Sequence, residues 1–269
     1  MLCCYKFTVI FRCGALVVLA MVVSTGVYAS RFDHSHSLWS ELLQTYVVDQ
    51  GDFSQVKYQA LKQSGTAPLV EYLQSLSAVH ASQFALWTQS QQLAFLINAY
   101  NAFTVKLILD HYPVESIKDI GGFFRSPWKI QFFALLGDKT HLDYIEHELI
   151  RGRFKEPRIH FAVVCASIGC PKLQARAYTA ERMEAMLESA TQTFLRDDSR
   201  NRYDAQRNTL HLSKIFKWYA EDFVATSGSV ERFVAPYISD DPKMRQQIQS
   251  RQVDVEYLDY DWALNNADI

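Results

Sequence analysis

The residues best suited to chemistry are gathered in one short stretch, residues 158–173, which reads RIHFAVVCASIGCPKL. It contains His160, Cys165 and Cys170, and no other cysteine follows residue 13. A thiol close to an imidazole has a lowered pKa and can act as a nucleophile. Two cysteines with four residues between them can instead form a disulfide in an oxidising compartment. The stretch therefore predicts either thiol chemistry or a short disulfide loop.

The apolar run over 158–165 is expected to be a β-strand. In a regular strand, His160 and Cys165 point to opposite faces, which makes Cys165 a packed wall residue. Cys170 lies beyond the following loop and can fold back toward His160. Glu146, on the helix expected before the strand, could orient the imidazole. We therefore hypothesise a catalytic arrangement in which Cys170 is the nucleophile, His160 the base and Glu146 the orienting acid.

Metal and redox chemistry fit this stretch less well. Two cysteines with four intervening residues and one histidine lack the paired spacing of a structural zinc site, so no metal is expected. The familiar redox spacing has two intervening residues. No motif for a cofactor is present, and none is expected.

The strongest predicted element is a long helix over 89–111, with apolar residues on most of its sides. Asn98 and Asn101 lie one turn apart on one face, and buried amides need hydrogen-bond partners. These amides either tie down neighbouring loops or line a polar pocket. In the second interpretation, Trp128 and Trp262 complete a ligand-binding site with them.

Hydrophobic periodicity and turn residues predict the remaining elements. Hairpins are expected at 127–142 and 201–212, further helices at 38–48, 68–76, 143–151, 178–195, 213–223, 229–237 and 242–248, and a half-buried strand at 253–258. Hairpins placed between helices favour an α+β fold over a doubly wound sheet. We expect a single mixed domain over 30–269, with its helices packed on a small antiparallel or mixed sheet.

The N-terminus is typical of a cleaved signal peptide over residues 1–29. Lys6 and Arg12 precede an apolar core at 14–23, and Val27-Tyr28-Ala29 suits a signal peptidase. The apolar core is short for a membrane span of ~20 residues. The mature protein is therefore expected in the periplasm, without a membrane-spanning segment.

Charge and composition limit the partners. The chain has 269 residues with 27 basic and 29 acidic side chains, and removal of the leader leaves 25 basic residues and a formal charge of −4. No basic patch of the kind that binds nucleic acid is present. The expected partner is an unknown small molecule or an envelope protein.

Several ordered motifs resemble one family, the domain of unknown function 547 family. They are Leu96-Ile97-Asn98-Ala99-Tyr100-Asn101-Ala102, Ile145-Glu146-His147 with Arg151, the run 158–167 with Cys170-Pro171, and Tyr260-Asp261-Trp262-Ala263-Leu264-Asn265. The resemblance implies a family core over about 85–200, with the segment 253–265 packing back on it. It also implies exported bacterial and intracellular plant members, but no activity and no catalytic residues.

Three functions remain open from the sequence. The first is an exported binding module, with a polar pocket around Asn98, Asn101, Glu146 and His160. The second is a thiol hydrolase or acyl transferase that uses Cys170. The third is a thiol–disulfide protein that uses both cysteines.

Overall fold

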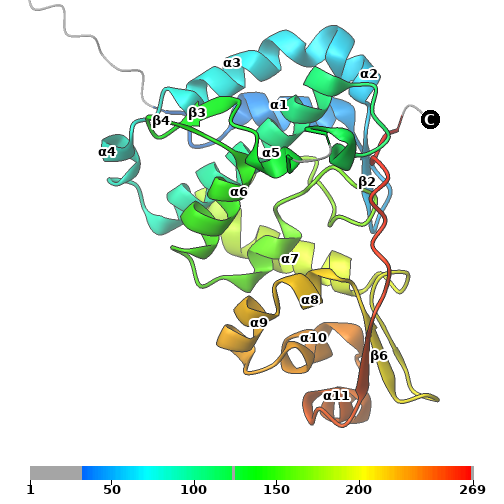
Figure 1. Ribbon diagram of the computed structural model, residues 1–269. Coiled ribbons are helices and arrows are strands. Elements are labelled where there is room, and N and C mark those ends of the chain that lie inside the picture. Colours follow the sequence, from blue (N-terminus) through cyan, green and yellow to red (C-terminus); the bar gives the residue numbers. More distant parts are fainter. Residues whose placement is uncertain (1–31, 123–124, 268–269) are drawn as a thin grey trace, which may run out of the picture. The chain divides into compact units, whose positions relative to one another are not determined.

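The computed structural model describes residues 32–122 and 125–267. The predicted signal peptide lies outside the described residues. Phe32–Ile269 forms one compact unit with a mixed α+β architecture, as predicted (Figure 1).

Helices account for most of this unit. The α-helices are α1 (Ser37–Tyr46), α2 (Tyr58–Ala60), α3 (Thr66–Ser77), α4 (Ala81–Phe84), α5 (Gln89–His111), α6 (Leu142–Tyr144), α7 (Met183–Leu195), α8 (Ile215–Trp218), α9 (Ala220–Ser227), α10 (Val230–Ile238) and α11 (Pro242–Gln249). Two π-helical segments, η1 (Leu61–Gly65) and η4 (Ile145–Arg151), continue α2 and α6. Short 3-10 helices are η2 (Ile117–Asp119), η3 (Pro127–Lys129), η5 (Pro157–Phe161) and η6 (Ala180–Arg182).

The strands form three small sheets instead of one. The strands are β1 (Val47–Asp49), β2 (Ser54–Val56), β3 (Phe133–Leu135), β4 (Asp138–Thr140), β5 (Arg202–Asp204), β6 (Thr209–Leu212) and β7 (Asp254–Tyr257). The pairs β1–β2 and β3–β4 are antiparallel hairpins. In the third sheet, β6 pairs antiparallel with β5 and parallel with β7, with Leu210 opposite Val255.

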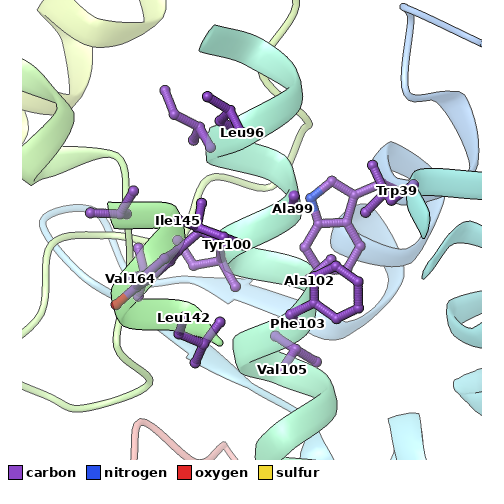
Figure 2. Packing of buried hydrophobic residues seen from close by; sticks show 14 of the residues in the cluster. Trp39, Leu96, Ala99, Tyr100, Ala102, Phe103, Val105, Leu142, Ile145 and Val164 are labelled. Atoms are coloured by element: carbon purple, nitrogen blue, oxygen red, sulfur yellow. The ribbon is translucent and has the colours of Figure 1, made fainter. Parts of the chain in front are cut away.

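The central helix α5 has the bounds that the sequence predicts. Its N-terminus is closed by a capping box between Thr88 and Gln91, and sixteen of its 23 residues are buried. Figure 2 shows its side chains packed between Trp39 and a group from other segments, namely Leu142, Ile145 and Val164. Among the described residues α5 alone is long and apolar enough to cross a membrane, but 89% of its most apolar window is buried inside the protein. Its hydropathy is therefore explained by its place in the core.

The chain after β7 packs back on distant segments. The Leu264 amide donates to the Glu115 carbonyl, and Ala267 and Val56 form a further backbone bond at β2. Figure 1 shows this C-terminal segment, in red, passing from β6 toward β2. It brings Tyr260 and Trp262 alongside the cysteine loop, where the Ile168 amide donates to the Ala263 carbonyl.

The strand predicted over 158–165 is wrong, because Pro157–Phe161 forms the 3-10 helix η5. Pro157 fits the first helical position, and the Glu156 side chain accepts a hydrogen bond from the Arg158 amide. The alternation argument for His160 and Cys165 therefore does not apply. In this turn, Ile159 joins one hydrophobic cluster and Phe161 joins another. His160 thus lies where the two clusters of the core meet.

Candidate functional site

A cavity of about 240 Å³ lies beside η4, η5 and the cysteine loop. Its walls come from segments far apart in the sequence: Tyr100, Ser126, Trp128, Asp143, Glu146, His147, His160, Val163, Cys165, Cys170, Pro171, Ile215, Trp218, Tyr219, Tyr260 and Trp262. A larger and more open depression runs along α3, but Glu71 is the one charged side chain among its described lining residues. Converging polar and aromatic groups make the first cavity the candidate site.

One side of the site is an ion-pair network centred on Asp222. The guanidinium of Arg151 binds this carboxylate with two hydrogen bonds, of 2.6 and 3.0 Å. The Nε2 atom of His160 lies 2.7 Å from the same carboxylate. Burial alone would raise the pKa of Asp222, but the hydrogen bonds from His160 and Arg151 hold it well below its usual range.

His160 is buried and neutral in this network. Its side chain has 0% exposure. Burial lowers its pKa, against the opposing effect of Asp222. The neutral ring donates its Nε2–H to Asp222, and the other nitrogen, Nδ1, is buried without a hydrogen-bond partner among the described residues. Nε2 is therefore committed to Asp222, whereas Nδ1 keeps its lone pair but has almost no accessible surface.

Tyr219 links this network to the second carboxylate of the site. Its ring stacks on the His160 ring, with centroids 3.9 Å apart. Its hydroxyl donates to Glu146 Oε1 at 2.5 Å. Burial and the nearby Glu146 charge raise the pKa of Tyr219 far above its usual value, so the hydroxyl remains a donor.

Glu146 is buried, with 5% exposure, and accepts its hydrogen bond from the Tyr219 hydroxyl. Burial and the nearby Glu146 charge raise the pKa of the Tyr100 hydroxyl well above its usual value. Among the described residues, no Lys or Arg forms an ion pair with Glu146. Arg151 interacts with the Glu146 charge at longer range but is itself bonded to Asp222. The Glu146 carboxylate thus has a hydrogen-bond donor but no ion-pair partner.

His147 and Asp143 extend this acidic wall. An Arg151 N–H lies 2.6 Å from His147 Nδ1. Since arginine can only donate, Nδ1 carries no hydrogen, and the His147 ring is neutral. Its Nε2 lies 3.7 Å from Asp143, which is too long for a hydrogen bond.

The lining also contains a wall of four aromatic side chains that contact one another. Tyr260 lies 4.6 Å from Trp262 and 4.9 Å from Trp218, measured between ring centroids. Trp128 meets Trp262 edge-on at 5.8 Å. Trp218 is 45% exposed, so this wall is open to solvent at one edge. Trp218 lies in the region 213–223 that the sequence predicts to be a helix.

The two cysteines form a disulfide, and both line the cavity. The Tyr260 hydroxyl donates to Cys170 Sγ at 3.3 Å. Cys170 is 3% exposed, whereas Cys165 is half-buried. Cys165 is therefore the more accessible of the two, opposite to the sequence-based assignment of roles. While bonded to each other, neither sulfur is a thiolate.

The structure places the predicted catalytic residues Cys170, His160 and Glu146 around one cavity but pairs them differently. The carboxylate that bonds to His160 is Asp222, so the expected pairing of His160 with Glu146 is corrected. Sequence reasoning missed Asp222 because it lies 62 positions beyond His160 on an ordinary surface helix.

Asn98 and Asn101 tie down the chain and do not line the cavity. The Asn98 amide bonds to the backbone N–H and C=O of Tyr178. Asn101 donates to the Ala162 carbonyl and accepts from the Val164 amide. These bonds shape the segment that leads into the cysteine loop, whereas the predicted binding residues Trp128 and Trp262 do line the cavity.

No group of three or more His, Cys, Asp or Glu side chains suited to a metal ion occurs in the part of the chain that the structure describes. The polar groups of the cavity are instead engaged in pairwise hydrogen bonds with one another.

Comparison with known proteins identifies the class of this domain. Residues 84–195 match the family described as Protein of unknown function, DUF547, and this part of the chain is similar to that family. No curated protein and no solved structure matches it. The matched stretch contains Tyr100, Glu146, His160 and both cysteines, whereas most of the aromatic wall and Asp222 lie beyond it.

Proposed function

We propose that this protein is an exported binding module that takes a small organic ligand into the cavity between Glu146 and the aromatic wall. The observation that carries the proposal is the cavity itself, in which a buried carboxylate and four aromatic rings converge. Its volume, about 240 Å³, suits a ligand smaller than a typical drug.

Features of the same site argue against thiol catalysis. A Cys170 nucleophile requires a free thiol and a base with an accessible nitrogen. The Cys170 sulfur is bonded to Cys165. The His160 Nε2 atom is bonded to Asp222, and the Nδ1 atom is buried. A binding function needs neither group to react.

A thermal-shift screen of a metabolite collection tests the proposal. At least one compound should raise the melting temperature of the wild-type protein, and Val163→Phe, which fills the cavity, should abolish that shift. The variant Cys165→Ala/Cys170→Ala should retain it. If no compound binds, or if the double variant alone loses binding, the binding proposal fails.

Thiol labelling provides the complementary measurement. Protein purified without reductant should take up no iodoacetamide at Cys165 or Cys170 until it is reduced. Quantitative labelling of Cys170 in the native protein would support the hydrolase alternative instead.

Export is tested at the N-terminus. When the full chain is expressed in a bacterium with a periplasm, we expect mass spectrometry to find a mature protein that begins at Ser30. A periplasmic fraction without the protein, or a chain that retains residues 1–29, would contradict export.

A further inference from the structure

We infer that the ligand is a small organic cation, such as a quaternary or alkylated ammonium group, held between Glu146 and the aromatic wall. This inference rests on the proposed binding function and names the class of ligand. It follows from three properties of the cavity: the charges that line it, the engagement of nearby cations, and the faces of its aromatic rings.

The charges on the lining are of one sign. Asp143 and Glu146 are its acidic side chains, and the lining contains no Lys or Arg among the described residues. Its imidazoles add no positive charge, because His147 accepts a hydrogen bond from Arg151 and His160 is buried as the neutral form. The formal charge of the wall is therefore −2, which disfavours an anionic ligand.

Two cations that contact residues of this site, Arg151 and Lys118, are already engaged. Arg151 uses one edge of its guanidinium for Asp222 and another N–H for His147. Lys118 lies 4.9 Å from the centre of the Trp262 ring. A buried carboxylate without a counter-charge is costly, and a ligand cation would supply that charge.

The aromatic wall suits the same ligand. A cation is attracted to the face of a Trp or Tyr ring, most strongly where water is excluded. Trp218, Tyr260 and Trp262 are mutually tilted by 34° to 57°, so their faces do not all lie in one plane. An alkylated ammonium group exploits such a wall better than a metal ion does, because it loses little hydration on burial.

Isothermal titration of the full-length mature protein with choline and with 3,3-dimethylbutan-1-ol tests the inference. The two molecules have almost the same shape, but only choline is charged. We expect choline to bind at least ~10-fold more tightly, a ratio that corresponds to about 1.4 kcal/mol. Equal affinity for the two molecules, or binding of the alcohol alone, would overturn the cation inference, and so would failure of choline to bind.

Two substitutions test which side chains are responsible for choline binding. Glu146→Gln should weaken choline binding ~10-fold or more, whereas Glu148→Gln, an exposed carboxylate two positions away in η4, should leave it unchanged. Trp218→Leu, at an exposed position, should weaken it several-fold through loss of a ring face. Circular dichroism checks that each variant is folded. Equal choline affinity in wild type and a folded Glu146→Gln variant would contradict the inference.

The failures of the two proposals are distinguishable. If a neutral compound binds to wild type and is lost in Val163→Phe, the binding function stands and the cation inference falls. If neither choline nor any member of the metabolite collection binds, the binding function itself falls.

Discussion

Two carboxylates lie on either side of Tyr219 and His160, and the fold treats them differently. Asp222 is compensated by a two-pronged contact from Arg151 and by the His160 N–H. Glu146 is more deeply buried, yet it receives a hydroxyl hydrogen from Tyr219 and forms no ion pair with a Lys or Arg among the described residues. The charge of Asp222 is thus paired with a cation, whereas the Glu146 carboxylate only accepts a hydrogen bond.

This difference separates a structural acid from a ligand-binding acid. An ion pair that is complete within the protein contributes to stability and is costly to break from one side. A carboxylate that lines a cavity without a counter-ion gains little for stability, but it can contribute to binding. The two sides therefore predict opposite outcomes for matched substitutions.

The largest effect is expected for Asp222→Asn. Loss of the charge leaves Arg151 without its partner at a site where both side chains are about three-quarters buried, with 22% and 27% exposure. We expect the free energy of unfolding to fall by about 2 kcal/mol, after discounting for partial exposure. Urea denaturation measures it. The control is Asp110→Asn at the exposed Lys106 pair, which should cost less than about 0.5 kcal/mol.

The next effect is the response of stability to acid. The folded-state pKa of His160 is lowered by burial, so below pH ~6.5 the unfolded chain takes up a proton that the folded chain does not. Stability should therefore fall as the pH is lowered from about 6.5. His36, whose pKa burial lowers to about 4, adds to the same slope. The depressed pKa of Asp222 adds a further loss below pH ~4.

The variant His160→Gln isolates the contribution of His160. Glutamine can still donate to Asp222 but does not titrate, so the stability difference from wild type should change by about 1 kcal/mol between neutral pH and pH 5. The slope due to His36 should remain in the variant. A difference that is constant with pH would show that His160 is not held neutral by the fold.

The smallest effect on stability is expected for Glu146→Gln. The amide oxygen can still accept from Tyr219, and the free energy of unfolding should change by less than about 1 kcal/mol. If this variant is destabilised as much as Asp222→Asn, Glu146 is a structural residue and the contrast between the two carboxylates disappears.

Local sequence patterns predicted the elements whose cause is local. The bounds of α5 follow from its continuous apolar residues and the Thr88 cap, and the hairpin of β5 and β6 follows from alternation around a turn. The Asn98 and Asn101 amides had two interpretations, and their backbone bonds to Tyr178 and to 162–164 agree with the structural one. The 3-10 helix η5 was missed because its apolar residues have the composition of a strand.

The site depended on contacts that no local pattern encodes. Arg151, Tyr260 and Trp262 belong to the motifs that resemble the family. Those motifs indicated that these residues are important, but they did not show which groups the residues contact. Tyr219 and Trp218 were predicted only to belong to an aromatic-rich helix over 213–223, because helical periodicity does not show which cavity a side chain enters. Asp222 had no sequence signal, since an acid in the first turn of a helix is expected at the surface.

The sequence by itself determined the α+β class, the central helix, the similarity to one family and the stretch around His160, Cys165 and Cys170 as the place to look. Composition, periodicity and ordered motifs are sufficient to predict these properties. Only the tertiary structure decided that Cys165 and Cys170 are joined, that His160 pairs with Asp222, and that Glu146 lines one cavity with the aromatic rings, with no ion-pair partner in the part of the chain that the structure describes. The physical reason is that each of these outcomes depends on which groups share a low-dielectric space, and that is set by long-range packing.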